Sequence, residues 1–297
     1  MQSCNTTCPY CGVGCGVVAT FDEHGVASVR GDPDHPANGG RLCSKGSALD
    51  ETVSLQERLL YPEIAGTQVS WEQALTTVAG RFSEIIAEHG ADAVAFYVSG
   101  QLLTEDYYVA NKLMKGFIGS ANIDTNSRLC MSSAVAGYKR AFGEDCVPCS
   151  YDDLDRAKMI VITGSNTAWC HPVLYQRIVK AKKENPDLFI VNIDPRGTRT
   201  NSVADMHLAI QPGKDSLLFN GLLAWLDECG EHNSLFTDHF TNGLDEALSA
   251  AKKSAPSIDS VALECGLDVD QVREFYRMFA RTERTVTLFS QGINQSS

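Results

Sequence analysis

The stretch MIVITGSNTAWCHPVLYQRIVKAKKENPDLFIVNI, residues 159–193, decides the fold class. It opens on the apolar run MIVIT, continues with a helical pattern over 171–184, and ends on LFIVNI at 188–193. Strand, helix and strand in this order predict two parallel strands joined by a crossover helix. Because both runs are almost entirely apolar, we expect a sheet that helices cover on both faces.

The alternation of strands and helices extends on both sides of this stretch. We expect a helix to begin at Ser70, with Gln73 three residues on, and to end at Gly90. Further strands are expected at 93–98, 207–211 and 285–290, and further helices at 104–119, 215–228 and 268–281. Nearer the N-terminus, residues 16–31 predict two short strands joined by a turn at His24 and Gly25. The fold class is therefore α/β, with a small N-terminal β-rich domain followed by Rossmann-like parallel-sheet domains.

Composition narrows the function classes. The chain has 25 basic and 37 acidic residues, so its net charge of -12 argues against general binding to nucleic acid or an anionic membrane. It has no apolar run long enough to span a bilayer and begins with polar residues, so we expect no export signal and a cytoplasmic protein. Eleven cysteines, five of them within the first 43 residues, favour metal binding in a reducing compartment.

Four of these cysteines have the spacing of a cluster site. Cys8, Cys11, Cys15 and Cys43 form C-x2-C-x3-C-x27-C, which places three thiols in one glycine-rich loop. A [4Fe–4S] cluster needs four thiolates, and glycines let the backbone curl around the sulfurs. Structural zinc is the alternative, although zinc sites favour two separated C-x2-C pairs. Cys4, just upstream, is interpreted as a spare thiol.

The segments TTCPYCGVGCGV (6–17) and RLCSKG (41–46) closely resemble the N-terminus of the molybdopterin oxidoreductases related to nitrate reductases and formate dehydrogenases. The resemblance covers nearly the whole chain. It implies a [4Fe–4S] cluster and molybdenum held by bis-molybdopterin guanine dinucleotide. It also implies that Lys45 lies between cluster and pterin and helps electrons pass; judged alone, this lysine would be a solvated surface charge.

The segment NSRLCMSSA (126–134) resembles the one in which this family places its molybdenum ligand, which makes Cys130 the candidate ligand. A soft thiolate suits a metal that already carries dithiolene sulfurs, whereas without the family Cys130 would be a buried free thiol. Asn126 and Arg128 become candidate cofactor contacts. Formate dehydrogenases typically have histidine after this cysteine; here Met131 follows, and CMSSAVAGYKRAFG looks like assimilatory nitrate reductase.

The other candidate cofactor residues follow expected strands. Gly164, Ser165 and Asn166 come after MIVIT and precede a helix, a position that phosphate-binding loops use, but no G-x-G-x-x-G indicates NAD. The resemblance makes this loop part of the guanine dinucleotide site. Open α/β sheets bind ligands at the carboxyl ends of their strands. The remaining candidates, each an ordinary turn or loop residue if judged alone, are Gln101, Asp194, Arg196, Gln211, Gly213, Asp215, Gln291 and Gln295.

Five cysteines remain outside these sites. Cys146 and Cys149 form a lone C-x2-C that we interpret as structural thiols, with a redox or second-metal role as the alternative. Cys170, Cys229 and Cys265 show no ligand spacing and are expected to be packing residues.

Three parts are expected: an iron–sulfur domain at 1–59, the first part of an α/β domain carrying the molybdenum-ligand loop at 60–150, and a Rossmann-like dinucleotide-binding domain at 151–297. The resemblance implies reduction of nitrate to nitrite, with electrons from ferredoxin, flavodoxin or an NADH-dependent flavoprotein. The alternatives are a formate dehydrogenase and a non-catalytic iron–sulfur electron-transfer fragment. Catalytic chains of this family run considerably further, so we expect the isolated chain to bind a cluster without turning over nitrate.

Overall fold

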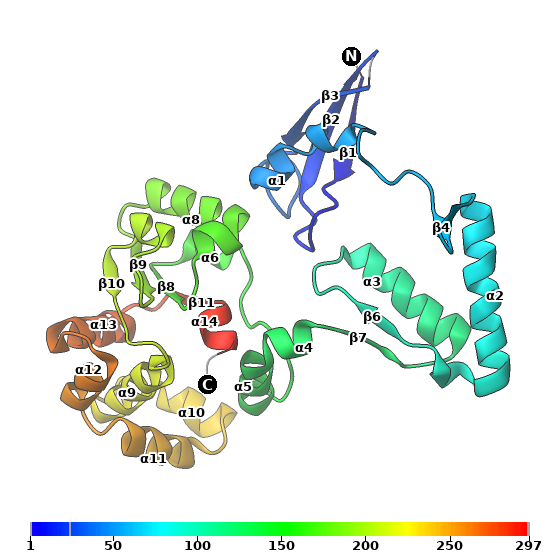
Figure 1. The fold of residues 1–297 in the computed structure, drawn as a ribbon. Coiled ribbons are helices and arrows are strands. Elements are labelled where there is room, and N and C mark those ends of the chain that lie inside the picture. Colours follow the sequence, from blue (N-terminus) through cyan, green and yellow to red (C-terminus); the bar gives the residue numbers. More distant parts are fainter. Residues whose placement is uncertain (1, 24, 296–297) are drawn as a thin grey trace. The chain divides into compact units, whose positions relative to one another are not determined.

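The computed structural model describes residues 2–23 and 25–295, and the chain divides into a first compact unit that ends at Leu129 and a second that begins at Cys130 (Figure 1). Each unit is described by itself. The turn predicted at His24 lies outside the described residues. Within residues 2–23 and 25–295, no helix is both long and apolar enough to cross a lipid bilayer.

The first unit begins with a three-stranded antiparallel sheet in the order β1-β2-β3. Its strands are β1 (Gln2–Thr7), β2 (Gly16–Asp22) and β3 (Gly25–Gly31). The pair predicted within residues 16–31 is confirmed, and the first four residues of β2 are buried. The sequence did not predict β1, because QSCNTT is polar, every residue in it is exposed, and its strand form depends on pairing with β2.

A loop with short elements then leads to the long helix α2 (Trp71–His89). The Oγ of Ser70 accepts a hydrogen bond from the Gln73 N–H at 3.2 Å, and Gly90, at φ 87°, ends the helix, as predicted. The short elements before α2 are α1 (Ser44–Ser47), a 3-10 turn (Asp50–Val53), β4 (Glu63–Ile64) and β5 (Thr67–Gln68).

Two short parallel strands, β6 (Phe96–Val98) and β7 (Ile123–Thr125), follow α2. The predicted strand at 93–98 is shorter than expected, because a 3-10 turn occupies Ala91–Ala93. The predicted helix at 104–119 is α3 (Thr104–Asn111), which continues as a π-helical segment over Lys112–Ile118. The strand β7 was not predicted, since three residues carry no periodicity.

The second unit is built on a four-stranded parallel sheet in the order β10-β9-β8-β11. From β8 (Met159–Thr163) the chain proceeds outward through β9 (Phe189–Ile193) to β10 (Met206–Leu208). It then returns to the other side of β8 as β11 (Thr285–Phe289). The direction of winding therefore reverses between β8 and β11, and in such sheets the crevice outside the carboxyl ends at this point binds ligands. The strand predicted at 207–211 ends earlier, at Leu208.

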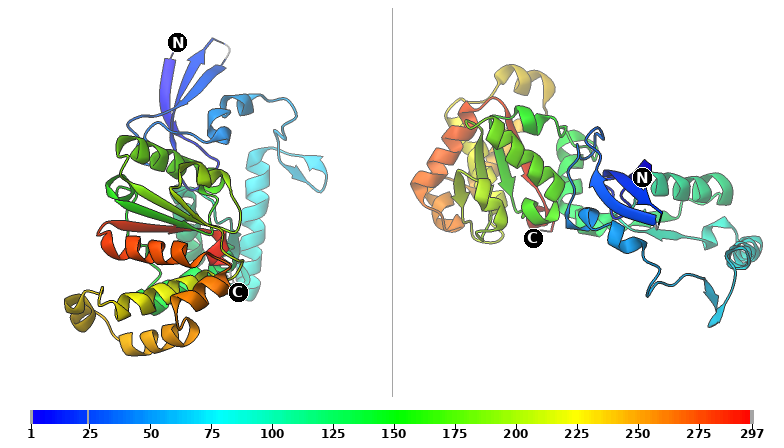
Figure 2. Two further views of the ribbon diagram at one scale, coloured as in Figure 1. Left: turned by 90° about the vertical axis from the view of Figure 1, so that its left-hand side faces the viewer. Right: turned by 90° about the horizontal axis from the view of Figure 1, so that it is seen from above.

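The helices of the second unit cover both faces of this sheet; Figure 2 shows the strands between α8 and α13. The helical elements of this unit are α5 (Ser132–Phe142), α6 (Asp153–Arg156), α7 (Thr167–Cys170), α8 (Pro172–Glu184), a 3-10 turn (Arg199–Val203), α9 (Asp215–Glu228), α10 (Ser234–Phe240), α11 (Leu244–Ser254), α12 (Ile258–Cys265), α13 (Val269–Arg281) and α14 (Gln291–Asn294), while α4 (Ser127–Cys130) spans the boundary between the units.

Alternate residues of β8 enter two different cores. Met159 and Val161 pack with α9, α12 and α13, whereas Ile160 and Ile162 pack with α6 and α8. All four side chains are fully buried, which confirms a sheet covered on both faces. Cys265 is fully buried in the first core, as predicted, and burial raises its pKa to about 11. Cys170 and Cys229 are exposed, so the prediction that they are packing residues was wrong.

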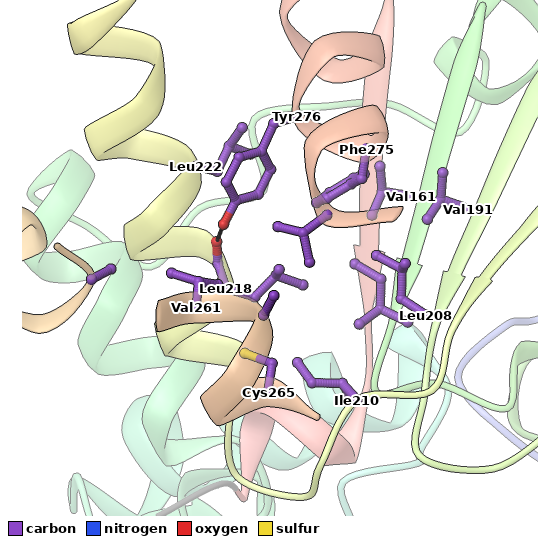
Figure 3. Packing of buried hydrophobic residues seen from close by; sticks show 14 of the residues in the cluster. Val161, Val191, Leu208, Ile210, Leu218, Leu222, Val261, Cys265, Phe275 and Tyr276 are labelled. Atoms are coloured by element: carbon purple, nitrogen blue, oxygen red, sulfur yellow. Dashed lines mark hydrogen bonds between the residues drawn. The ribbon is translucent and has the colours of Figure 1, made fainter. Parts of the chain in front are cut away.

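In the first core, α9 lies against α12 and α13 at a glycine. The hydroxyl of the buried Tyr276 donates to the carbonyl of Leu218 at 2.6 Å (Figure 3). A Cβ added at Gly221 would lie 2.5 Å from that hydroxyl and 2.8 Å from a methyl carbon of Val261. Both neighbours are fully buried and have little room to give way, so the helices approach this closely only because residue 221 has no side chain.

We therefore predict that Gly221→Ala lowers the free energy of unfolding by about 1–3 kcal/mol, because the added methyl overpacks the core. The matched control is Gly137→Ala in α5, where an added Cβ meets nothing within 4 Å. That change should raise stability by about 0.5–1 kcal/mol through helix propensity. Urea unfolding measures both variants, and equal effects of the two would contradict the packing argument.

Candidate functional site

Three of the predicted cluster ligands lie in one loop between β1 and β2. The Cys8 N–H donates to the Cys15 carbonyl at 2.8 Å, and the Gly14 N–H donates to the Cys11 carbonyl at 3.1 Å. Gly14 has φ +61°, which favours glycine. Cys8 and Cys15 are buried and Cys11 is half-buried. The loop therefore folds back on itself around its sulfurs.

The fourth cysteine is brought to this loop by Asn38, which the sequence analysis did not identify. The Gly16 N–H donates to the Asn38 Oδ1 at 2.9 Å, and the Asn38 Nδ2 donates to the Gly16 carbonyl at 3.0 Å. The same Nδ2 also donates to the Arg41 carbonyl at 2.8 Å. One buried amide therefore joins the residue after Cys15 to the segment that precedes Cys43. No spacing rule marks an asparagine of this kind.

The thiols of the loop act on one another electrostatically. Burial, together with the charge on Cys8, Cys11 and Cys43, raises the pKa of the Cys15 thiol to about 11. Burial also raises the pKa of Cys8, whereas the charge of Lys45 lowers it. The four predicted ligands and Lys45 therefore share one region of the first unit. Cys43 also caps α1, its Sγ accepting from the Gly46 N–H at 3.5 Å.

These residues fit a four-iron cluster in their chemistry. Four thiolates gathered without cations would repel one another, and iron supplies the compensating positive charge. In the part of the chain that the structure describes, no group of three cysteine, histidine or acidic side chains is close enough to hold a single metal ion. In a cluster each thiolate binds a different iron, so its ligands stand further apart than those of a lone ion.

In the second unit, the predicted cofactor residues lie at one edge of the sheet, in the loops at the carboxyl ends of its strands. The structure thus brings together residues from four separate stretches of sequence. Gly164, Ser165 and Asn166 follow β8; Asp194 and Arg196 follow β9; Gln211, Gly213 and Asp215 follow β10; Gln291 and Gln295 follow β11.

The loops after β8 and β11 touch backbone to backbone. The Gly292 N–H donates to the Gly164 carbonyl at 3.0 Å, and a Cβ on Gly292 would lie 2.5 Å from the Gly164 Cα. Gly164 has φ +56°, a conformation that glycine adopts readily. Beside this contact, the buried hydroxyls of Ser165 and Ser290 are hydrogen-bonded at 2.8 Å. We call these two contacts, Gly164–Gly292 and Ser165–Ser290, the loop clasp.

Two buried carboxylates lie along the same edge. Thr163 Oγ1 donates to Asp215 at 3.2 Å, and the Arg196 N–H donates to Asp194 at 2.9 Å. Burial raises the pKa of Asp215, and the nearby charge of Asp194 raises it further. Within residues 2–23 and 25–295, no cationic side chain forms an ion pair with either carboxylate. Such a pair can accept hydrogen bonds from a ligand that is rich in N–H groups.

Three further buried polar atoms lie near this edge. The Oδ1 of Asn192, the Oγ1 of Thr198 and the Oδ1 of Asn294 are buried without a hydrogen-bond partner among the described residues. Buried polar atoms ordinarily have partners. A ligand that carries N–H and hydroxyl donors would fit this set of groups.

Cys130 lies at this same edge, at the end of α4 and just before α5. Its thiol is half-buried, and the Gln291 Nε2 donates to the Cys130 Sγ at 2.7 Å. In α5, Tyr138 packs on Phe289 at the end of β11, with ring centroids 6.0 Å apart. The predicted metal ligand and the predicted dinucleotide residues are therefore neighbours within the second unit.

The remaining predicted residues belong to the first unit. Gln101 and Asn126 follow the carboxyl ends of the parallel strands β6 and β7. The Gly100 N–H donates to the Asn126 Oδ1 at 2.8 Å, which joins the two loops. The side chain of Arg128 lies outside the described residues.

The lone C-x2-C segment is separate from this edge. Cys146 is half-buried and Cys149 is exposed, and Cys149 lines a cavity of about 540 Å³ together with Arg156 and Arg284. The cavity lies at the amino ends of β8 and β11, opposite the predicted cofactor residues.

A cysteine-rich β domain and a parallel sheet with helices on both faces define the class: a metal protein with an α/β fold of the dinucleotide-binding type. The Molybdopterin oxidoreductase Fe4S4 domain matches residues 1–55, and the Molybdopterin oxidoreductase family matches residues 58–296. The chain belongs to the molybdopterin oxidoreductase family. It therefore contributes a [4Fe–4S] site and part of a molybdopterin site.

The chain resembles known proteins over nearly its whole length. It is 56% identical to a nitrate reductase of Klebsiella oxytoca over 297 residues, which cover 100% of this chain and 34% of that protein. It is 40% identical to a periplasmic nitrate reductase of Desulfovibrio desulfuricans, covering 97% of this chain and 40% of that protein. Acetylene hydratase from Pelobacter acetylenicus shares the fold, with a TM-score of 0.79 at 21% identity, over 98% of this chain and 40% of that one. The chain thus spans between a third and two fifths of these relatives.

We predict that Asn38→Ala weakens retention of the cluster, because the segment that precedes Cys43 loses its link to Gly16. Losing this buried amide should also cost the protein about 1–3 kcal/mol. The visible absorbance that bleaches with dithionite measures the cluster. Asn242→Ala, at an exposed loop position, is the control. Equal cluster content in the two variants would contradict the role of Asn38.

We also predict that Gly292→Ala separates the loops after β8 and β11 and lowers both the pterin content and the melting temperature. Its Cβ has no room beside Gly164, whereas at Gly197, in the loop after β9, the nearest atom to an added Cβ is 3.9 Å away. Gly197→Ala is therefore the control and should be tolerated. Pterin fluorescence after oxidation and thermal unfolding measure the two effects. A Gly292→Ala protein that is as stable and as rich in pterin as the control would disprove the argument.

Proposed function

We propose that the complete protein reduces nitrate to nitrite, in the reaction NO3⁻ + 2 H⁺ + 2 e⁻ → NO2⁻ + H2O. The observation that carries this proposal is the position of Cys130, a thiol held by Gln291 at the sheet edge where the predicted dinucleotide residues converge. The 56% identity to a nitrate reductase supports the choice of substrate.

Electrons reach the site through the first unit. Cys8, Cys11, Cys15 and Cys43 hold the cluster, and Lys45 stands beside these thiols, where its charge stabilises the thiolate of Cys8. We propose that Lys45 lies on the electron path from the cluster to the pterin. The donor is a ferredoxin, a flavodoxin or an NADH-dependent flavoprotein.

The second unit binds the metal and one end of its organic ligand. When bound, molybdenum with bis-molybdopterin guanine dinucleotide supplies oxygen-atom transfer chemistry. Cys130 provides the protein thiolate. The loop at Gly164 and Ser165 would bind a phosphate, and Asp194 and Asp215 would accept hydrogen bonds from the guanine. Gln211, Gly213 and Gln295 line the same edge.

The choice of nitrate over formate follows from the residue after the ligand cysteine. Met131 stands where formate dehydrogenases typically carry histidine, and the following segment resembles assimilatory nitrate reductase. We propose an assimilatory role in the cytoplasm. The free cysteines of the described residues suit a reducing compartment, although one relative is a periplasmic enzyme.

The test compares the wild-type protein, expressed from its complete coding region, with Cys130→Ala. Reduced methyl viologen serves as the donor, and nitrite formation is measured. We expect Cys130→Ala to lose at least about two orders of magnitude in activity, as removal of a catalytic group commonly does, while its cluster absorbance stays unchanged. The exposed Cys229→Ala is the control and should remain active. A wild-type protein that contains molybdenum but reduces a dye with formate, and does not reduce nitrate, would overturn the proposal.

A further inference from the structure

The side chain of Gln291, in the loop after β11, reaches the predicted metal ligand. Its Nε2 lies 2.7 Å from the Cys130 Sγ, and the two residues come from opposite ends of the second unit's sequence. Glutamine is uncharged and carries two N–H donors, so it can donate to sulfur without adding a charge to the site.

The backbone of Gln291 is held on both sides. Ser290, before it, is hydrogen-bonded through its buried hydroxyl to Ser165 at 2.8 Å. Gly292, after it, donates to the Gly164 carbonyl at 3.0 Å, with no room for a side chain. The loop clasp thus fixes the residue that carries the amide, and a long exposed side chain begins from a fixed point.

Cys130, the acceptor, is also held near the carboxyl end of β11. Cys130 lies two residues before the start of α5, and Tyr138 of α5 packs on Phe289, two residues before Gln291. Donor and acceptor are therefore both tied to the carboxyl end of β11.

We propose that Gln291 is a positioning residue, which orients the Cys130 sulfur by an N–H···S hydrogen bond and links that sulfur to the Gly164–Ser165 loop. The proposal rests on the assignment of Cys130 as the molybdenum ligand. It also couples the two loops physically: a ligand bound by the loop after β8 would affect the position of the Gln291 amide.

The hydrogen bond should shift the reduction potential of the metal in one direction. A donor to a metal-bound thiolate withdraws electron density from the sulfur, and such bonds raise the reduction potential of the metal. Removing the donor should therefore lower the potential of molybdenum while leaving the potential of the cluster in the first unit unchanged.

The first experiment measures the contact in the unloaded 297-residue chain, so its result does not depend on activity. Urea unfolding of Gln291→Leu, Cys130→Ala and the double variant forms a double-mutant cycle. We expect the double variant to be more stable than the sum of the single losses predicts. Once one partner has been replaced, replacing the other breaks no further hydrogen bond. Additive losses would overturn the proposal.

The second experiment uses the cofactor-loaded protein and EPR-monitored redox titration of Mo(V). Gln291→Leu removes both donors at similar size, and Gln291→Glu replaces them with acceptors. We expect the molybdenum potential to fall in Gln291→Leu and to fall further in Gln291→Glu. The cluster potential should not move, and Gln271→Leu, an exposed position in the first turn of α13, should match wild type.

The outcomes separate this proposal from the proposed function. An unchanged molybdenum potential and Mo(V) spectrum in Gln291→Leu would overturn the role of Gln291 even if wild type reduces nitrate. A shifted potential in a protein that never reduces nitrate would support Gln291 and overturn the proposed substrate.

Discussion

The second unit depends on one backbone contact, between Gly164 after β8 and Gly292 after β11. Neighbouring parallel strands at a reversal of winding send their loops apart, and here two residues without side chains let those loops meet. The hydroxyls of Ser165 and Ser290 are hydrogen-bonded beside this contact. Gln291 lies in sequence between Ser290 and Gly292, and its side chain donates to the thiol of Cys130. A larger residue at either glycine would move all three features together, because they share the same few ångströms of backbone.

The elements that sequence could predict are those whose local pattern and burial agree. The strands β8 and β9 are almost entirely apolar, so their composition alone indicated their position. The start of α2 followed from a serine cap. By contrast, β1 is polar and exposed, and β7 has three residues, so both exist through pairing with a neighbour, which no window of sequence contains. The helices α11 and α12 were missed for a related reason, because their short apolar patterns are explained only by packing against α9.

The candidate site divides in the same way. Four cysteines have the spacing of a cluster site, and open α/β sheets generally bind ligands at the carboxyl ends of their strands. The cluster loop and the ligand-binding end of the sheet could therefore be predicted from the residues alone. The parts that hold those residues in place could not. Asn38 joins the residue after Cys15 to the segment that precedes Cys43 through contacts that skip 22 positions of sequence, and Ser290 reaches Ser165 across 125. Exposed Cys170 and Cys229 show the opposite error, since an unassigned cysteine is not thereby a buried one.

The strand order of the second unit also constrains its biogenesis. In a chain emerging from the ribosome, β8 soon acquires β9 as a neighbour, but its other side stays unpaired until β11, the last in sequence of the four strands that the structure describes in this sheet, has been made. Until then β8 presents unpaired amides and carbonyls, the template on which strands of other molecules assemble. Pairing between such distant segments is also slow to form. Aggregation during synthesis is therefore the hazard that this topology creates, and it ends only when translation has passed the final strand.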